Sequence, residues 1–387
     1  MKILLAVETL HPGGAEMFVL RLAAALSRNH EVVLFRFYKE AADKAWIAKY
    51  PASFTHAWPE IPFDNFWRRA DRMLRLLRID FSFRDFRVKH FLKRLIATFK
   101  PDVIHSNQLK VDYIMAQVKN NQAFVITLHG DYKTFDELKD PTRNILNFNN
   151  KLGFIESKNP AFVYLSDAQR AYLTLKGIGN NRATTKIYNG YFAQAPQSKR
   201  DDSVFTFGMI ARGIPEKGWQ TAIDAFISVQ QEFPKTRLLL VGDSPYLQKL
   251  KATYAALTAI RFAGQSSDPL HWISQMHVGL LPSYYSSESL PTSVMEYLLC
   301  GVPVIASDAG EIENMIVTTE GTAGKAIHLE LNGSDAEHVS LWMKSYLADP
   351  DLYRKHSHLT IQAFKKFDMQ TCVEAYETLY RTELKSV

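Results

Sequence analysis

The sequence contains little cysteine, no long apolar run and, over most of its length, no excess of one charge. Cys300 and Cys372 are the only cysteines in 387 residues, so neither a disulfide framework nor a cysteine-based metal cluster is expected, which favours a reducing cytoplasm. No apolar run approaches the roughly 18–20 residues of a membrane span. The apolar stretch at residues 3–7 is too short for a secretory signal and ends at Glu8. We therefore expect a cytoplasmic protein without a membrane-spanning helix.

Short apolar runs alternate with helical patterns along the chain, which is typical of parallel sheets covered by helices on both faces. A length of 387 residues suits two domains, and a hydrophobic fraction of 47% excludes a disordered chain. A polar, proline-containing stretch at 194–202 is typical of a linker. The strands are expected at 2–7, 31–37, 103–105, 124–128, 162–165 and 185–188 before the linker, and at 204–210, 237–241, 260–263, 278–281 and 302–306 after it. The pattern predicts two doubly wound, Rossmann-like domains with a cleft between them, whose ligands bind beyond the carboxyl ends of the strands.

The positive charge of the chain is concentrated in residues 64–100. This segment holds eleven Lys and Arg against four Asp, a balance of +7, whereas the whole chain carries +6 and the remainder therefore −1. A helical pattern at 88–99 leads into the next strand and is interpreted as a crossover helix with a solvated basic face. An earlier pattern, around Trp67, repeats apolar residues beside several arginines. It fits either an anionic membrane surface or an ordinary solvated face. Nucleic acid is disfavoured because no recognised binding module accompanies the charge.

Three motifs at expected strand ends could carry chemistry. Gly13 and Gly14 open the first helix, where backbone amides favour phosphate, although the dinucleotide fingerprint G-x-G-x-x-G is absent. Arg212 and Lys217 follow the first strand of the second domain and could clamp a diphosphate. Glu288 precedes a helix that contains Glu296 among apolar residues, where a buried carboxylate needs a partner. A pair of sugar or ribose hydroxyls would satisfy that need, and so would a salt bridge.

Glu288 and Glu296 form a Glu-x7-Glu spacing that resembles the signature of retaining nucleotide-sugar glycosyltransferases with the two-Rossmann-domain (GT-B) fold, family 4. The resemblance covers nearly the whole chain. It is carried by GGAE at 13–16, PDVIH at 101–105, LHG at 128–130, IYNG at 187–190, Arg212 with Lys217, VGD at 241–243 and GVPVIAS at 301–307. It implies an acceptor domain at 1–193, a donor domain at 203–366, and a helix at 367–387 that returns to the first domain.

The resemblance also implies roles for individual residues. Arg212, Lys217, Glu288 and His129 would form the catalytic set: the two cations would neutralise the leaving diphosphate, Glu288 would bind the transferred sugar, and His129 would lie over it. Glu296 would bind the ribose. The remaining contacts to base, phosphate or sugar would come from Gly13, Gly14, Phe262, Ala263, Ser289, Leu290 and Thr292. No metal and no cofactor are implied, and the donor would be a nucleoside diphosphate sugar, with a UDP-sugar as the first choice. The acceptor hydroxyl would attack from the front face and pass its proton to the departing phosphate oxygen.

Two positions depart from the family pattern, since Ser289 replaces the usual glycine and Asn314 stands where an acidic residue is common. We expect a glycosyltransferase that extends a glycan or a membrane glycolipid or polyprenyl-linked acceptor in cell-surface polysaccharide synthesis. Its place would be the cytoplasm or, through residues 64–100, the cytoplasmic face of the inner membrane. The alternatives are a nucleotide-sugar epimerase or hydrolase on the same fold, and a catalytically silent sugar-binding homologue. His105 is expected to have a structural role.

Overall fold

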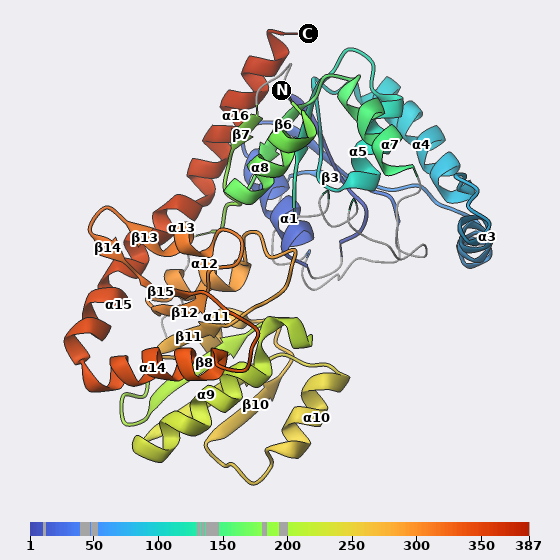
Figure 1. Ribbon diagram of the computed structural model, residues 1–387. Coiled ribbons are helices and arrows are strands. Elements are labelled where there is room, and N and C mark those ends of the chain that lie inside the picture. The colour runs from blue at the N-terminus through green and yellow to red at the C-terminus, as the bar shows by residue number, and fades with distance from the viewer. Residues whose placement is uncertain are drawn as a thin grey trace. The chain divides into compact units, whose positions relative to one another are not determined.

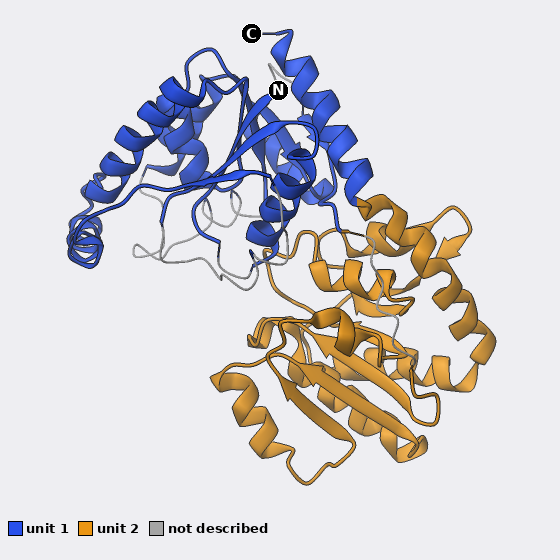
Figure 2. Ribbon diagram, turned by 180° about the vertical axis from the view of Figure 1, so that it is seen from behind, with its two compact units in different colours: residues 1–191, 369–387 blue, residues 192–368 orange. Residues whose placement is uncertain are grey.

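The structure, a computed structural model, describes residues 1–10, 13–38, 47, 53–129, 132, 136, 147–179, 184–192 and 200–386. The chain divides into two compact units (Figure 2): Met1–Tyr191 together with Met369–Val387, and Phe192–Asp368. Each unit is built on its own parallel sheet with helices packed against it (Figure 1). The expected fold class of two Rossmann-like α/β domains is thus confirmed. Most of the linker expected at 194–202 lies outside the described residues.

Among the described residues, the first unit has a seven-stranded sheet in the order β3-β2-β1-β4-β5-β6-β7. Its strands are short, apolar and mostly buried, as strands covered on both faces must be. They are β1 (Lys2–Val7), β2 (Glu31–Arg36), β3 (Thr55–Ala57), β4 (Val103–Ser106), β5 (Ala123–Thr127), β6 (Ala161–Tyr164) and β7 (Thr184–Lys186). The helices between them are α1 (Gly14–Leu26), α3 (Asp64–Leu76), α4 (Phe83–Phe99), α5 (Leu109–Val118), α7 (Phe148–Glu156) and α8 (Asp167–Lys176). The strand order reverses between β1 and β4, so a crevice is expected at their carboxyl ends.

The second unit repeats this plan with a six-stranded parallel sheet, as far as the described residues show, in the order β10-β9-β8-β11-β12-β15. Its strands are β8 (Phe205–Ile210), β9 (Thr236–Val241), β10 (Ile260–Gly264), β11 (Val278–Leu281), β12 (Val304–Ser307) and β15 (Gly324–Ile327). A small antiparallel pair, β13 (Val317–Thr318) and β14 (Gly321–Thr322), stands apart from this sheet. The helical segments are η1 (Pro215–Lys217), α9 (Trp219–Glu232), α10 (Pro245–Thr253), α11 (Pro269–Ile273), α12 (Thr292–Leu299), α13 (Ile312–Ile316), α14 (Asp335–Ala348), α15 (Pro350–Phe364) and η2 (Lys365–Phe367).

The final helix, α16 (Met369–Leu384), packs in the first unit, against α1 and β5. A buried polar network joins it to the sheet: the imidazole of His105 bonds Tyr380 Oη at 2.7 Å and Thr127 Oγ1 at 2.8 Å, and Tyr376 Oη lies 2.8 Å from the same Thr127 oxygen. Each of these polar atoms is buried, so each needs the partner that it has. His105 therefore has the structural role expected of it.

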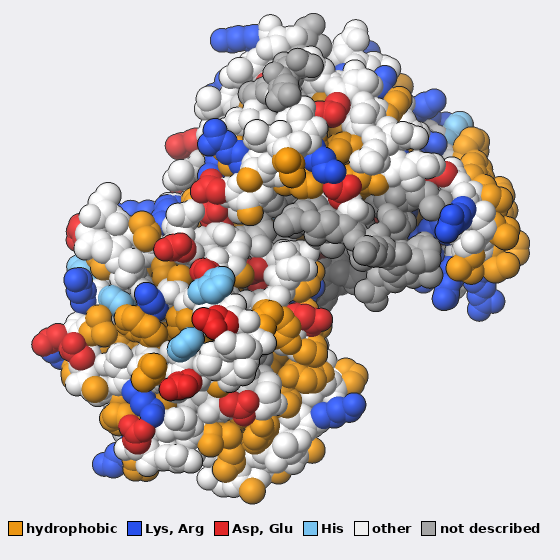
Figure 3. Space-filling model, viewed as in Figure 1, with side chains coloured by type: hydrophobic (Ala, Val, Ile, Leu, Met, Phe, Trp, Pro, Cys, Tyr) orange, Lys and Arg blue, Asp and Glu red, His pale blue; other side chains and the backbone are white. Residues whose placement is uncertain are grey.

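The α3 helix exposes its apolar residues and buries an acid. Of its residues, all of which the structure describes, Asp71 alone is fully buried, whereas Phe66 and Met73 are 61% and 60% exposed. Leu77, just after the helix, is 66% exposed. A surface helix of a water-soluble domain normally shows the opposite arrangement. Hydrophobic side chains consequently gather on the surface over α3 and the start of α4, with basic ones beside them (Figure 3).

Two carboxylates hold α3 rigidly on α4. Asp71 accepts hydrogen bonds from Ser82 Oγ at 2.7 Å and from the Phe83 amide at 2.9 Å, and so satisfies the free amides at the start of α4. Asp64 accepts two hydrogen bonds from the guanidinium of Arg84, at 2.6 and 2.9 Å. The side of α3 that carries Asp71 and half-buried Trp67 is therefore fixed to the protein, and Phe66 and Met73 are left outside.

Every strand expected from the sequence has a counterpart in the sheets, but the edge strands β3 and β15 were not expected, and several element ends differ. The helix at 88–99 is the crossover helix that its pattern predicts, because Val88, Leu92 and Ile96 of α4 belong to the core of the first unit. The units change at 191/192 and 368/369, each two residues from the expected 193 and 367. In the described part of the chain no helix is both long and apolar enough to cross a membrane.

Candidate functional site

The loop after β8 carries Arg212 and Lys217 and is locked in place by its neighbours. The indole Nε1 of buried Trp219 donates to the Arg212 carbonyl at 2.9 Å. Gly218 has φ = 81°, and a Cβ there would lie 1.9 Å from the Pro282 carbonyl oxygen, so only glycine fits. The loop thus lies directly against the end of β11, the strand next to β8 in the sheet.

Lys217 and Glu288 form a buried ion pair across this contact. The Lys217 ammonium lies 2.5 Å from Glu288 Oε2, and the two side chains are only 8% and 7% exposed. Ser283 Oγ donates to the same carboxylate oxygen at 2.7 Å. The sequence pointed to both charged residues as ligand-binding groups. In the structure each is held by the other.

Arg212 lies beside this pair but remains accessible. Its guanidinium carbon is 4.9 Å from the centre of the Tyr285 ring, and the Lys217 ammonium is also 4.9 Å from that centre. Both distances allow a cation–π attraction, which places one aromatic ring against two cations. Arg212 is exposed, whereas Lys217 is buried. The group therefore offers positive charge to the solvent through Arg212.

The start of α12 lies four residues after Glu288 in the chain and has no side-chain cap. Its N-cap residue is Pro291, which has no side-chain hydrogen bond to offer, so the amides of the first turn, beginning at Thr292, carry the partial positive charge of the helix end. Ser289 and Leu290 lie buried just before it, and Ser289 Oγ has no hydrogen-bond partner among the described residues. Gly310, at φ = 65°, passes so close that a Cβ would lie 2.4 Å from the Glu288 carbonyl oxygen.

The second turn of α12 holds Glu296, which is buried at 7% exposure. Its charge, together with burial, raises the pKa of the nearby Cys300 thiol to about 12, with burial the larger cause. The next residue, Tyr297, accepts a hydrogen bond from the Ile210 amide at 2.8 Å and so ties α12 to the end of β8. Asn314, the second departure from the family pattern, donates to Glu311 at 3.1 Å.

Phe262 and Ala263 lie at the carboxyl end of β10, the edge strand of the second sheet. Phe262 pairs with Leu240, but Gly264 pairs with the next residue, Val241, so Ala263 forms a bulge. Both predicted residues are half-buried. A bulge at a strand end turns the backbone out of the sheet, where it can contact a ligand.

The first unit holds the remaining predicted residues. His129 Nε2 lies 3.2 Å from Asn107 Oδ1, its ring packs 5.6 Å from that of Phe18, and burial lowers the pKa of its imidazole to about 3. The imidazole is therefore neutral at pH 7. Gly13 caps α1, and a Cβ there would lie 2.3 Å from a carboxylate oxygen of Glu16.

The sequence did not reveal the hydrogen bond that holds Glu16 at the start of α1. Its carboxylate accepts a hydrogen bond from Gln108 at 2.9 Å, and Gln108 in turn accepts one from the Glu8 amide at 2.7 Å. An acid therefore already lies at the start of α1, where Gly13 and Gly14 were expected to meet phosphate. The sequence also did not reveal that the Tyr285 ring lies against two cations, those of Arg212 and Lys217.

Family models match the two halves of the chain in turn. A model described as Glycosyltransferase Family 4 matches residues 12–191, and one described as Glycosyl transferases group 1 matches residues 192–366. The junction between these matches is also the boundary at which the first unit gives way to the second.

Individual proteins match this chain at low sequence identity or over only part of their length. The Vi polysaccharide biosynthesis protein VipC/TviE of Salmonella typhi is 34% identical over 129 residues, which cover 33% of this chain and 22% of that protein. Sulfoquinovosyl transferase SQD2 of Arabidopsis thaliana is 24% identical over 66% of this chain and 51% of its own length. The chain thus spans about half or less of these curated relatives. The protein in the crystal structure of Anabaena Alr3699/HepE in complex with UDP-glucose is 18% identical in sequence to this chain. The two structures superpose over 100% of both chains with a TM-score of 0.73, so they share the fold.

Proposed function

The chain carries in succession the two domains of a GT-B-fold glycosyltransferase, and we propose that it transfers a sugar, with retention of configuration, from a nucleoside diphosphate sugar to a glycan or lipid-linked acceptor. The reaction breaks the bond between the anomeric carbon and the diphosphate oxygen. It forms a bond between that carbon and an acceptor hydroxyl, whose proton passes to the departing phosphate. No metal takes part in the proposed step.

The observation that carries the proposal is the group formed by Arg212, Lys217 and Glu288 around Tyr285. Negative charge develops on the leaving diphosphate as the bond breaks, and fixed cations stabilise it without reorganisation. Arg212 supplies an exposed guanidinium and the α12 amides a helix terminus. Lys217 already has a carboxylate partner, so a diphosphate would share or displace Glu288 and leave that acid to accept hydrogen bonds from sugar hydroxyls.

The other predicted residues keep the roles that the family resemblance implies. Glu296 would hold the ribose, and the β10 bulge at Phe262 and Ala263 would flank the base. Ser289, Leu290 and Thr292 would contact phosphate or sugar, and the unpartnered Ser289 hydroxyl supports a polar ligand there. Neutral His129 is the proposed contribution of the first unit, with Gly13 and Gly14. The fold shared with a protein crystallised with UDP-glucose supports a UDP-sugar as donor.

Two measurements test the function. A thermal-shift panel of UDP-, GDP- and ADP-sugars should show stabilisation by one class of donor, because a ligand of the native state raises its stability. Product analysis with and without a glycan acceptor then separates the alternatives. Acceptor-dependent product supports transfer, rapid acceptor-independent breakdown or epimerisation indicates the alternative enzyme, and binding without turnover indicates the silent homologue.

We further propose that residues 64–100 place the protein on the cytoplasmic face of an anionic membrane. The exposed apolar side chains of α3 would enter the interface between headgroups and acyl chains, and the neighbouring arginines would meet the lipid phosphates. An amphipathic helix bound in this way explains why Asp71 faces the protein and Phe66 faces outward. The acceptor would then be a membrane glycolipid or polyprenyl-linked glycan, and the product would belong to a cell-surface polysaccharide.

A further inference from the structure

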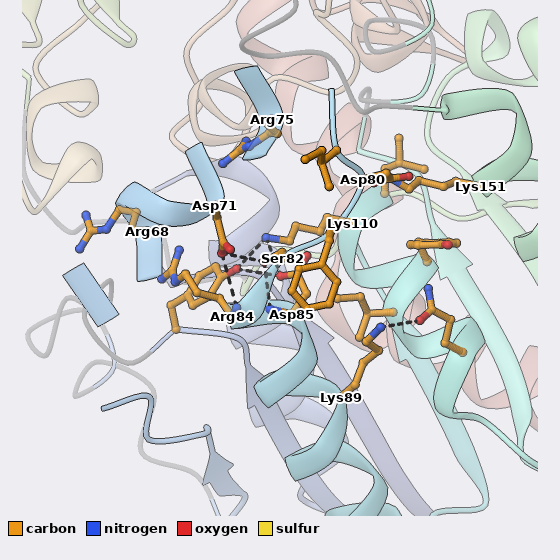
Figure 4. A pocket seen from close by; sticks show the side chains of 17 residues that line it. Arg68, Asp71, Arg75, Asp80, Ser82, Arg84, Asp85, Lys89, Lys110 and Lys151 are labelled. Carbon is orange, nitrogen blue, oxygen red and sulfur yellow. Dashed lines mark hydrogen bonds and ion pairs between the residues drawn. The ribbon is translucent and has the colours of Figure 1, made fainter. Parts of the chain in front are cut away.

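A cavity of about 260 Å³ lies beneath the outward-facing α3 helix (Figure 4). Its wall comes from α3, α4, the loop between them and α5, with Tyr38 from just after β2 and Lys151 from α7. Pockets for drug-sized ligands usually measure roughly 300–1,000 Å³, so this one suits a small group. All of its lining residues belong to the first unit, and none of them is a residue proposed to hold the donor.

The lining carries more positive than negative charge. Six cations line it against three acids, and each acid is already engaged. Asp71 caps α4, Asp80 pairs with Lys151 at 2.6 Å, and Asp85 pairs with Lys110 at 3.0 Å. The cations of the lining are Arg68, Arg75, Arg84, Lys89, Lys110 and Lys151.

Two of these cations have no carboxylate partner among the described residues, namely Arg75 on α3 and Lys89 on α4. The Lys89 ammonium donates only to the amide oxygen of Gln117, at 3.0 Å. Arg84 is held by Asp64, and its guanidinium carbon lies 3.7 Å from the centre of the Tyr38 ring. The paired residues thus form a rigid wall, and Arg75 and Lys89 add two uncompensated charges to it. An anion in the cavity would be attracted by both charges.

We propose that this cavity binds the phosphate or diphosphate group of a lipid headgroup, an inference that deepens the proposed function and rests on its membrane-bound acceptor. Lipid is the source that the position favours, because the exposed apolar residues Ile79 and Phe81, in the loop after α3, line the cavity and would bring it to headgroup depth. Arginine and lysine donate charge-assisted hydrogen bonds to phosphate oxygens, which are stronger for a terminal phosphate monoester than for a diester. The chemical group recognised is therefore a terminal phosphate or diphosphate.

The test compares vesicles of phosphatidylcholine that contain phosphatidic acid with vesicles brought to the same surface charge with phosphatidylglycerol. Phosphatidic acid exposes a phosphate monoester, and phosphatidylglycerol does not. The full-length protein should co-sediment more strongly with the first kind. The variant Arg75→Gln/Lys89→Gln should lose this preference, with binding to phosphatidic acid weakened by about tenfold for each cation removed.

Arg72→Gln/Lys93→Gln is the matched control, since it removes the same charge from exposed positions of α3 and α4 that do not line the cavity. It should weaken binding to both vesicles alike and keep the preference. Thermal unfolding checks that both variants fold. Arg75→Gln/Lys89→Arg, which keeps the charge at position 89, should bind phosphatidic acid better than Arg75→Gln/Lys89→Gln. The cavity site is overturned if the wild type shows no preference, or if both double variants lose it equally.

Inorganic pyrophosphate separates the two sources of the anion. If pyrophosphate stabilises the wild type more than Arg75→Gln/Lys89→Gln, which keeps the proposed donor site, and phosphatidic acid is also preferred, the lipid phosphate assignment stands. If pyrophosphate binds but the vesicles show no preference, the lipid assignment is overturned. None of these measurements involves a nucleotide sugar, so stabilisation by the donor can succeed or fail independently of them.

Discussion

The ammonium of Lys217 lies 2.5 Å from the carboxylate of Glu288, and less than a tenth of either side chain is exposed. A pair this well buried has lost most of its hydration and depends on its own attraction and on the Ser283 hydroxyl for compensation. The pair therefore contributes to the stability of the fold, and the same two residues belong to the proposed catalytic group. Effects on folding and on turnover must be measured separately at these positions.

Removing one member of the pair should destabilise the second unit. Lys217→Met leaves the Glu288 carboxylate buried without a counter-charge, so the free energy of unfolding should fall by about 3 kcal/mol. The double variant Lys217→Met/Glu288→Met removes both charges and should lose less than the sum of the two single variants. Urea unfolding followed by tryptophan fluorescence measures this cycle. Additive losses would show that the pair does not couple.

Arg212 should matter for turnover and not for stability. Because it is exposed, Arg212→Ala should change the free energy of unfolding by no more than about 0.5 kcal/mol. Removal of a donor that stabilises transition-state charge typically lowers kcat by about a hundredfold or more. Lys249→Ala, at an exposed position of α10, is the control for a lost surface cation. Near-normal sugar transfer by Arg212→Ala would sink the proposed role of this residue.

Acid should destabilise the first unit through His105. Burial, and secondarily the neighbouring His129, lower the pKa of His105 to about 3, from 6.5 in the unfolded chain. Between these values the unfolded chain binds a proton that the folded protein does not, so stability is complete above pH 6.5 and is lost as the pH falls. A group shifted this far contributes a loss of about 2 kcal/mol between pH 7 and pH 5.

The contribution of His105 can be isolated by substitution. His105→Gln should flatten the dependence of unfolding free energy on pH, whereas His90→Gln, at an exposed position of α4, should leave it unchanged. His129, whose pKa burial also lowers to about 3, would supply a residual slope of the same sign. An unchanged slope in His105→Gln would show that this imidazole does not control the acid sensitivity.

Binding to anionic vesicles should depend on the apolar face of α3. Met73→Asp places a charge where the helix would enter the bilayer and should weaken binding by about tenfold or more, since burial of such a side chain contributes roughly 1.5–3 kcal/mol. Leu175→Asp is the control, at an exposed apolar position of α8. Binding should also fall as salt rises and when Arg68, Arg69, Arg72 and Arg75 become Gln. Equal effects of the two Asp variants, or salt-insensitive binding, would contradict this docking surface.

Most strands could be predicted from the sequence because strands buried on both faces appear as short, nearly continuous apolar runs, whereas the partly exposed edge strands β3 and β15 give no such run. The α3 helix shows the limit of such patterns. Its periodicity revealed that it is amphipathic, but the side that faces the protein is decided by Asp71, whose partners are Ser82 and Phe83 at the start of another helix. Nothing in the local sequence specifies that contact.

The candidate site shows the same limit. Arg212, Lys217, Glu288 and Glu296 stand out because charged groups at strand ends and inside an apolar helix need partners. Lys217 and Glu288 are 71 residues apart, and their contact depends on β8 and β11 being neighbours in the sheet. The chemistry of the sequence therefore indicated the residues, but it did not show that two of them bind each other.

The return of α16 to the first unit has a consequence for the order in which the protein is made. A ribosome completes residues 1–191 and then the whole of the second unit before it releases the residues that bring Tyr376 and Tyr380 to His105 and Thr127. Until then the imidazole and the threonine hydroxyl have no helix to cover them. The second unit can therefore fold first during synthesis. The first unit can be completed only after α16 has been synthesised.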